Sequence, residues 1–225
     1  MLKVGLTGGI GCGKSEVSDY FKNWGAYIFD ADKEAKNIIN NNKIAQEEII
    51  QEFGSDVIDS DNVINKSKLA RIAFQDEFHQ LKLNSIIHPY VFKEIDNTFN
   101  KIKINDNYKI FVLDAALIYE SGADTHLDYI IVVSSLLRFR TERVMKRGNI
   151  SREDFMKRLS LQWPDEDKEN MADYIIQNNS NLNTLKVESK KVELLNKAKK
   201  TQLYKSVIEK FPDADLIEID TSKKD

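Results

Sequence analysis

The chain has 225 residues, of which 41% are hydrophobic and 31% are charged, and its 33 basic and 36 acidic side chains leave a net charge of −3. This length can bury a large core, and the even charge balance argues against a protein that coats nucleic acid or an anionic membrane. Cys12 is the only cysteine, which excludes an intramolecular disulfide and fits a reducing compartment.

Short β-rich runs alternate with longer helical patterns along the chain. The expected strands, mostly uninterrupted apolar runs, are Leu2–Thr7, Ala26–Phe29, Lys109–Leu113, Tyr129–Val133 and Tyr174–Gln177. The expected helices are Lys14–Trp24, Lys33–Phe53, Lys66–Lys101, Leu136–Arg147, Arg152–Gln162 and a long lysine-rich helix from about Asn181 to Lys210, followed by an apolar tail at Leu216–Ile219. Apolar strands separated by helices predict a doubly wound α/β fold, with a mainly parallel five-stranded sheet covered on both faces.

The spacing of these elements predicts one domain with two additions. We expect a nucleotide-binding core at about 1–59, 106–136 and 166–225, and a helical insertion at 60–105 that is too long for one crossover and covers a substrate. A charge-dense segment at 137–165 is expected to form a lid, in which Ser151 and Asp154 form a capping box that starts a helix. Oligomeric state is not encoded in any motif, and we expect a monomer or a weak homo-oligomer.

No run of about eighteen apolar residues occurs, so we expect no membrane span. The first residues lead directly into the first expected strand and the glycine-rich loop after it, which leaves no room for a cleavable signal peptide. We therefore expect a cytoplasmic protein.

The loop after the first strand has the spacing of a phosphate-binding loop. Gly8, Gly13, Lys14 and Ser15 fit the pattern G-x-x-x-x-G-K-[ST] between a strand and a helix. In such a loop the backbone N–H groups and the helix N-terminus surround the phosphates, the lysine neutralises them, and the serine hydroxyl binds Mg²⁺. The residues that we expect to bind ATP here are Gly9, Gly11, Cys12, Gly13, Lys14, Ser15 and Glu16. A dinucleotide-binding register of glycines fails in this loop, and Cys12 is interpreted as a small residue that fits rather than a redox sensor.

Other classes of nucleotide-binding protein lack support in the sequence. A GTPase would need an aspartate three residues before a switch glycine, and no glycine in the chain has one. A motor ATPase would more often end its hydrophobic strand in Asp-Glu, whereas here Asp114 is followed by two alanines. The sequence therefore favours a small kinase whose phosphoryl acceptor is a small molecule.

A run of cations in the expected lid supports phosphoryl transfer. Its members are Arg138, Arg140, Arg143, Lys146, Arg147, Arg152, Lys157 and Arg158. The spacing of Arg140, Arg143 and Arg147 places them on one helix face. A solvated charged face or a nucleic-acid patch would show a similar run, but a closing lid gives the guanidinium groups a role on the transferred phosphoryl group. We expect Arg143 and Arg147 to contact ATP.

Carboxylates are expected at the carboxyl edge of the sheet, where ligands of such folds bind. Asp30 and Asp32 follow the second expected strand, and either could accept a proton from an acceptor hydroxyl. Asp114 ends the third strand and could hold Mg²⁺ through water. Aspartates at strand ends also serve as helix caps, so spacing alone does not decide these roles.

Several segments in fixed order resemble the dephospho-coenzyme A kinase family over about residues 2–200. These segments are Gly5–Ser15, Phe29–Asp32, His88-Pro89, Leu117–Gly122, Arg143–Arg147 and Ala172–Asn179. The resemblance implies ATP- and Mg²⁺-dependent phosphorylation of the ribose 3′-hydroxyl of dephospho-CoA, with a helical CoA-binding insertion and a lid. It implies that Lys14, Asp32 and Arg140 are catalytic, with Asp32 as the base, and that Asn178 lies near the nucleotide base. The acceptor-binding residues it implies are Asp32, His88, Leu117, Tyr119 and Glu120.

The chain departs from the family pattern in three places. Cys12 replaces serine, Ala115–Ile118 replaces Val-Pro-Leu-Leu, and Leu161–Pro164 replaces Ser-Gln-Met-Pro. These exchanges leave the charged groups unchanged, although the second alters the expected acceptor wall. A kinase that acts on a nucleoside or nucleotide is the alternative enzyme, and a non-catalytic nucleotide sensor is the alternative from another class.

Overall fold

The computed structural model describes residues 1–61, 63–105 and 107–199. The five strands are β1 (Leu2–Thr7), β2 (Tyr27–Asp30), β3 (Ile110–Asp114), β4 (Tyr129–Ser134) and β5 (Tyr174–Gln177), in the spatial order β2-β3-β1-β4-β5 with every pair parallel. The predicted doubly wound α/β fold is confirmed. The chain leaves β1 toward the β2 edge of the sheet and leaves β4 toward the β5 edge. Ligands of such folds bind at the carboxyl ends of the strands where the direction changes, which here lies between β1 and β4.

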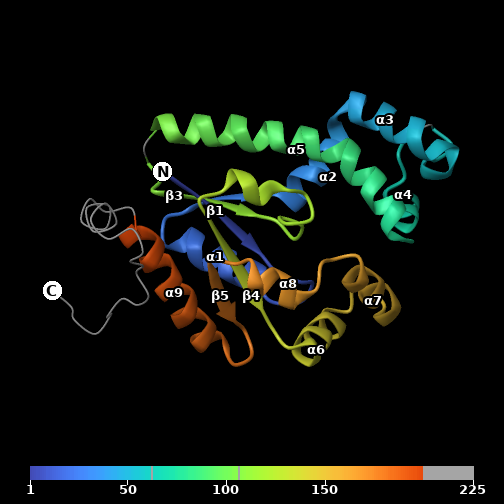
Figure 1. Ribbon diagram of the computed structural model, residues 1–225. Coiled ribbons are helices and arrows are strands. Elements are labelled where there is room, and N and C mark those ends of the chain that lie inside the picture. The colour runs from blue at the N-terminus through green and yellow to red at the C-terminus, as the bar shows by residue number, and fades with distance from the viewer. Residues whose placement is uncertain (62, 106, 200–225) are drawn as a thin grey trace.

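Helices cover both faces of the sheet (Figure 1). The helices are α1 (Lys14–Asn23), α2 (Ala31–Asn41), α3 (Lys43–Phe53), α4 (Lys66–Ala73), α5 (Glu77–Asn105), α6 (Leu137–Arg147), α7 (Arg152–Ser160), α8 (Asp165–Asn170) and α9 (Leu182–Lys199), with short 3-10 helices η1 (Gly54–Val57) and η2 (Ala123–His126). Alternate residues of β3 show why its apolar run is continuous. Phe111 and Leu113 pack with α2 and α5, whereas Ile110 and Val112 pack with α1 and α9.

Two predicted helices are each divided in the structure. The single helix predicted at Lys33–Phe53 is wrong, because Asn42 has an extended backbone and its side chain accepts from the N–H groups of Ile44 and Ala45, which starts α3. The single helix predicted at Lys66–Lys101 is also wrong, since α4 ends before Phe74 and the Asp76 carboxylate caps α5 through the N–H of His79.

The remaining boundaries differ little from expectation. The predicted helix start at Ser151 is confirmed, with the Asp154 N–H donating to the Ser151 hydroxyl at 3.0 Å, and the Asp154 carboxylate accepts from that hydroxyl at 2.8 Å. The short helix α8 follows the lid and was not predicted. The last part of the helix predicted to Lys210 and the apolar tail Leu216–Ile219 lie outside the described residues. Among the described residues no helix is long and apolar enough to cross a bilayer.

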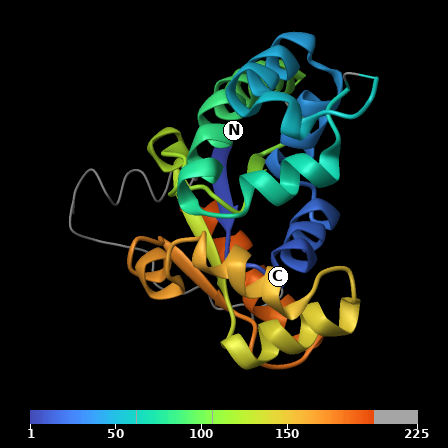
Figure 2. The ribbon, with the colours of Figure 1, turned by 90° about the vertical axis from the view of Figure 1, so that its right-hand side faces the viewer.

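The two segments predicted as a helical insertion (60–105) and a lid (137–165) rise over the carboxyl edge of the sheet, and these names are kept for them below. Figure 2 shows the helices of the insertion, α4 and α5, above and the lid helices α6 and α7 below. α5 packs on α2 and α3 as well as on α4. The lid returns to the sheet through α8, which packs on β4.

Candidate active site

The phosphate loop joins β1 to α1, and its backbone can be built only with glycine at critical positions. Gly13 has φ +99° and precedes the first residue of α1. A Cβ at Gly13 would overlap the side-chain amide of Asn178, which donates to the Cys12 carbonyl at 2.8 Å. The left-handed backbone at Gly13 thus shapes the loop, and the hydrogen bond from Asn178 supports it.

Lys14 brings two carboxylates together at the start of α1. Its Nζ pairs with the Asp114 carboxylate and lies 3.5 Å from Oδ2 of Asp32. Burial alone would lower the pKa of Lys14, but the charges of Asp114 and Asp32 outweigh it and raise that pKa. Burial raises the pKa of Asp114, and the Lys14 charge opposes this. The site therefore holds a firmly charged ammonium that can exchange its carboxylate partners for phosphate oxygens.

The two candidate bases after β2 have different environments. The Asp30 carboxylate accepts from the Lys33 N–H at 2.8 Å and so caps α2. The Asp32 side chain is 49% exposed and faces Lys14 from the first turn of the same helix. Asp30 is thus used as a helix cap, whereas Asp32 lies partly exposed beside Lys14.

Arg140 lies buried against the loop rather than on an open lid face. Its Nε donates to the Ile10 carbonyl at 2.7 Å, and its Nη1 pairs with Asp165 at the start of α8. Its Nη2 is buried and has no hydrogen-bond partner among the described residues. A Cβ at Gly9 would overlap this guanidinium and lie 2.5 Å from Asp165 Oδ1. Arg140 therefore offers a free N–H group beside the loop backbone.

Arg143 and Asn178 hold the opposite side of the loop. The Arg143 guanidinium donates to the Asn178 carbonyl at 2.8 Å and to the Ser135 hydroxyl at 3.0 Å, and it approaches the Cys12 carbonyl at 3.4 Å. Burial raises the pKa of the Cys12 thiol, whose side chain is only 2% exposed. These contacts make Arg143 and Asn178 supports of the loop.

The lid end contacts the loop tip through an amide. The Ile10 N–H donates to Oε1 of Gln162 at 2.9 Å, and the Ile10 carbonyl accepts from Arg140. Both polar groups of one loop residue are therefore bound by residues at the two ends of the lid. Movement of the lid would change the environment of the loop.

The segment that follows β3 contains Tyr119 and Glu120, and these residues contact Trp163 at the end of the lid and Lys168 of α8. The Glu120 carboxylate pairs with the buried Lys168 ammonium at 2.7 Å and accepts from the Trp163 N–H at 2.9 Å. The Tyr119 and Trp163 rings stack with centroids 6.1 Å apart, and burial raises the pKa of Tyr119 to about 12. The second Glu120 oxygen and the Tyr119 hydroxyl are buried without a hydrogen-bond partner among the described residues.

Other predicted site residues lie apart from these contacts. His88 is half-buried in the middle of α5, its ring lies 5.9 Å from that of Phe92, and burial lowers its pKa. Leu117 is half-buried, while Arg147 is exposed near the end of α6. Ser15 and Glu16 are exposed in the first turn of α1, where a ligand on the loop would meet them.

Some residues of the site were not predicted from the sequence. Gln162 and Asp165 bind the loop tip and Arg140, and the departure of Leu161–Pro164 from the family pattern was the one signal near them. Lys168 stands in an acidic run, Asp165–Glu169, that is typical of a solvated helix. Its burial depends on Glu120, which is distant in sequence.

Known proteins resemble this chain over most of its length. The model of the family described as dephospho-CoA kinase matches residues 2–184. A dephospho-CoA kinase from Aquifex aeolicus is 38% identical over 192 residues, which cover 85% of this chain and 96% of that protein. One from Fusobacterium nucleatum is 40% identical over 190 residues, which cover 84% and 94%.

Solved structures resemble it in fold. A dephospho-CoA kinase from Campylobacter jejuni has a TM-score of 0.61 and 27% identity, covering 87% of this chain and 96% of that chain. A shikimate kinase from Acinetobacter baumannii in complex with shikimate, with a TM-score of 0.51, 13% identity and coverage of 89% and 96%, shares the fold alone.

Proposed function

The chain belongs to the dephospho-CoA kinase family, and on that premise we propose how its residues transfer the terminal phosphoryl group of ATP to the ribose 3′-hydroxyl of dephospho-CoA. This reaction is the last step of coenzyme A biosynthesis. The observation that supports our assignment of roles is the convergence of Lys14, Asp32 and Asp114 beside the phosphate loop.

Binding of ATP replaces the contacts of Lys14. Its ammonium leaves the carboxylates for the β- and γ-phosphates, while the N–H groups of the loop and the N-terminus of α1 surround the phosphate oxygens. The carboxylates of Asp32 and Asp114, no longer paired with Lys14, can then contact the acceptor and a cation. The ATP-binding residues that we propose are the loop residues from Gly9 to Glu16 given above, with Arg143, Arg147 and Asn178 as further contacts.

The residues present fit a magnesium ion that arrives with the nucleotide. Mg²⁺ usually takes one or two protein ligands together with phosphates and waters. Ser15 is exposed in the first turn of α1, and Asp114 ends the neighbouring strand β3. The described residues contain no cluster of three or more His, Cys, Asp or Glu that would hold an ion without the nucleotide. Ser15 would bind Mg²⁺ directly and Asp114 through water, and the ion would neutralise charge on the β- and γ-phosphates.

Asp32 acts as the general base. It accepts the proton of the 3′-hydroxyl as that oxygen forms a bond to the γ-phosphorus, and the bond to the β–γ bridging oxygen breaks to release ADP. Lys14 and the free Nη2 of Arg140 offset the charge that spreads over the transferred group. Most of the acceleration should come from this positioning and electrostatic stabilisation.

The acceptor would lie between the helical insertion at 60–105 and the lid at 137–165, bordered by His88, Leu117, Tyr119 and Glu120. The division into a core, an insertion and a lid, the monomeric or weakly associated state, the absence of nucleic-acid binding and the cytoplasmic location stay predictions. The even overall charge supports the absence of nucleic-acid binding.

An assay of ADP release tests the proposal. The purified chain is given ATP and Mg²⁺ with dephospho-CoA, with a series of nucleosides and nucleotides, or with no acceptor. We expect release that depends on dephospho-CoA and a product that carries a 3′-phosphate. Equal release with every acceptor, or with none, would contradict the proposal, and a preference for a nucleoside or nucleotide would support the alternative kinase.

A further inference from the structure

Arg140 and Asp165 lie at the two ends of the lid and bind each other beside the phosphate loop. The Nε of Arg140 donates to the Ile10 carbonyl at 2.7 Å, and its Nη1 pairs with the Asp165 carboxylate. The side chain of Arg140 is 1% exposed, whereas that of Asp165 is 36% exposed. Because two of its three nitrogens are bound, the plane of the guanidinium group is fixed, and Nη2 is the nitrogen left for a ligand.

The free nitrogen of Arg140 lies directly against the phosphate loop. A Cβ at Gly9 would overlap Nη2 and Cζ of Arg140 and would lie 2.5 Å from Oδ1 of Asp165. The backbone of Gly9 does not have a positive φ, unlike that of Gly8, Gly11 and Gly13. The need for glycine at this position therefore comes from the close approach of the ion pair, which forms part of the loop's own surroundings.

Asp165 is the first residue of α8, and this helix is bound to the core at two points. The buried Lys168 ammonium lies 2.7 Å from the Glu120 carboxylate, in the segment that follows β3. The Ser134 hydroxyl, at the end of β4, donates to the Glu169 carboxylate. Figure 1 shows α8 beside the sheet, with α7 farther from it. The carboxylate that binds Arg140 is therefore carried by a helix that is attached to the core.

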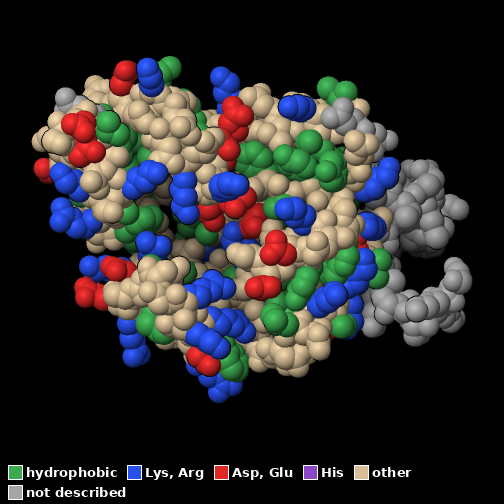
Figure 3. Space-filling model, turned by 180° about the vertical axis from the view of Figure 1, so that it is seen from behind, with side chains coloured by type: hydrophobic (Ala, Val, Ile, Leu, Met, Phe, Trp, Pro, Cys, Tyr) green, Lys and Arg blue, Asp and Glu red, His purple; other side chains and the backbone are tan. Residues whose placement is uncertain are grey.

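The outer part of the lid has more space around it than these two ends. A cavity of about 860 Å³, lined by residues of η1, α4 and α7, separates α7 from the insertion. Figure 3 shows a hollow there, between the upper and lower parts at the left of the view. The cavity leaves α7 room to move relative to the insertion, whereas the contacts of Arg140 tie the ends of the lid to the loop.

We propose that Asp165 is a positioning residue for phosphoryl transfer, which fixes Arg140 beside the phosphate loop before ATP binds. The inference rests on the proposed function, in which Nη2 of Arg140 offsets charge on the transferred group. The contacts of Arg140 with Ile10 and Asp165 are made by the chain itself and need no ligand, so closure of the lid is not required to bring the guanidinium group to the loop. A donor that is already in place costs no reorganisation during the reaction, so Asp165 acts on turnover more than on binding.

The first test compares Asp165→Asn with the matched control Asp167→Asn. Both aspartates lie in the first turn of α8, so each substitution removes one negative charge from the same helix end, and Asp167 is exposed. Loss of the charge that holds Nη1 should lower kcat about 10–100-fold in Asp165→Asn. The KM values for ATP and dephospho-CoA should stay within about threefold of wild type, and Asp167→Asn should match wild type.

A double variant shows whether Asp165 acts through Arg140. Arg140→Met should lower kcat about 10²–10³-fold, and the addition of Asp165→Asn should lower it less than about twofold further. An equal loss from Asp165→Asn in both backgrounds would overturn the inference, as would an unchanged kcat in Asp165→Asn alone. Thermal melting of each variant sets an assay temperature at which all of them are folded.

A second measurement depends neither on activity nor on a variant at Asp165. In wild-type enzyme with isotope-labelled arginine and no nucleotide, the Nε–H of Arg140 should give an NMR signal that exchanges slowly with solvent, because it is buried and bound to the Ile10 carbonyl. The loss of this signal in Arg140→Met assigns it. Fast exchange, or slow exchange that begins only when ATP is added, would overturn the inference. Wild-type enzyme whose ADP release ignores dephospho-CoA would instead contradict the proposed function, and the NMR signal separates that failure from this one.

Discussion

Breaking the buried ion pair between Glu120 and Lys168 by removing one partner should destabilise the fold at the lid end. The Lys168 side chain is 0% exposed and that of Glu120 is 12% exposed, and their charged atoms lie 2.7 Å apart. Lys168→Met keeps most of the side-chain volume but leaves the Glu120 carboxylate buried with only the Trp163 N–H as a donor. An uncompensated buried charge costs about 3–5 kcal/mol, and we expect a loss of that size in the free energy of unfolding.

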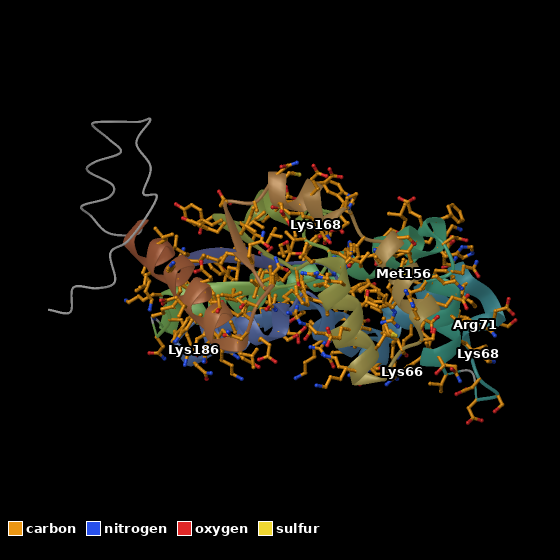
Figure 4. The ribbon with its side chains drawn as sticks, turned by 90° about the horizontal axis from the view of Figure 1, so that it is seen from below. Lys66, Lys68, Arg71, Met156, Lys168 and Lys186 are labelled. Atoms are coloured by element: carbon orange, nitrogen blue, oxygen red, sulfur yellow. The ribbon has the colours of Figure 1, made fainter. Side chains whose placement is uncertain are left out.

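Urea denaturation and thermal melting measure the effect. For a chain of this length each kcal/mol corresponds to about 2–4 °C, so the midpoint should fall by roughly 6–20 °C. Glu120→Gln combined with Lys168→Met should recover much of this loss, because no buried charge remains. Lys186→Met on α9 serves as the control, since Lys186 is exposed and lies far from Lys168 in Figure 4.

A loss below about 1 kcal/mol in Lys168→Met would refute the reasoning, because it would mean that solvent screens the pair. The folded double variant also separates two roles of Glu120. A KM for dephospho-CoA near that of wild type would make Glu120 an anchor for the lid end and nothing more. A large rise in that KM would confirm the predicted contact with the acceptor.

Three further perturbations test the site. Gly13→Ala adds a Cβ at φ +99° that overlaps the Asn178 amide, so the affinity for ATP should fall at least about tenfold. An unchanged affinity would contradict the conclusion that the loop needs glycine at this position. Cys12, buried with a raised pKa, should react with iodoacetamide far more slowly in the folded chain than in urea, and equal rates would refute its burial. His88 has a pKa lowered by burial, so the unfolded chain binds a proton more readily and stability should fall as the pH drops through about 6.5. His88→Gln should lose less stability than wild type between about pH 7.5 and pH 5.5, and an equal loss would exclude this cause.

The sheet and the phosphate loop could be predicted because their signals are local. An uninterrupted apolar run fixes a strand that is covered on both faces, and the eight loop positions from Gly8 to Ser15 carry their own backbone requirements. The breaks at Asn42 and Phe74 were missed although Asn42 is a strong capping residue. The apolar periodicity on both sides of each break continues, and it outweighed the single capping signal.

The contacts of the site were less predictable because they join residues that are distant in sequence. The spacing of Arg140 and Arg143 indicated one helix face, but only the fold shows that Arg140 lies beside Ile10 and that Arg143 lies beside Asn178. Similarly, spacing left Asp30 and Asp32 equivalent as bases. Their difference arises because one carboxylate caps α2 while the other faces Lys14.

The catalytic turnover of Asp32→Asn with dephospho-CoA tests the central claim most directly. Asparagine keeps the size of the side chain but cannot accept the proton of the 3′-hydroxyl, so turnover should fall about 10²–10⁴-fold. The dissociation constant of ATP should change little, because the loop and Lys14 hold the nucleotide. Turnover near that of wild type, with 3′-phosphorylated product still formed, would contradict the role of Asp32 as the base.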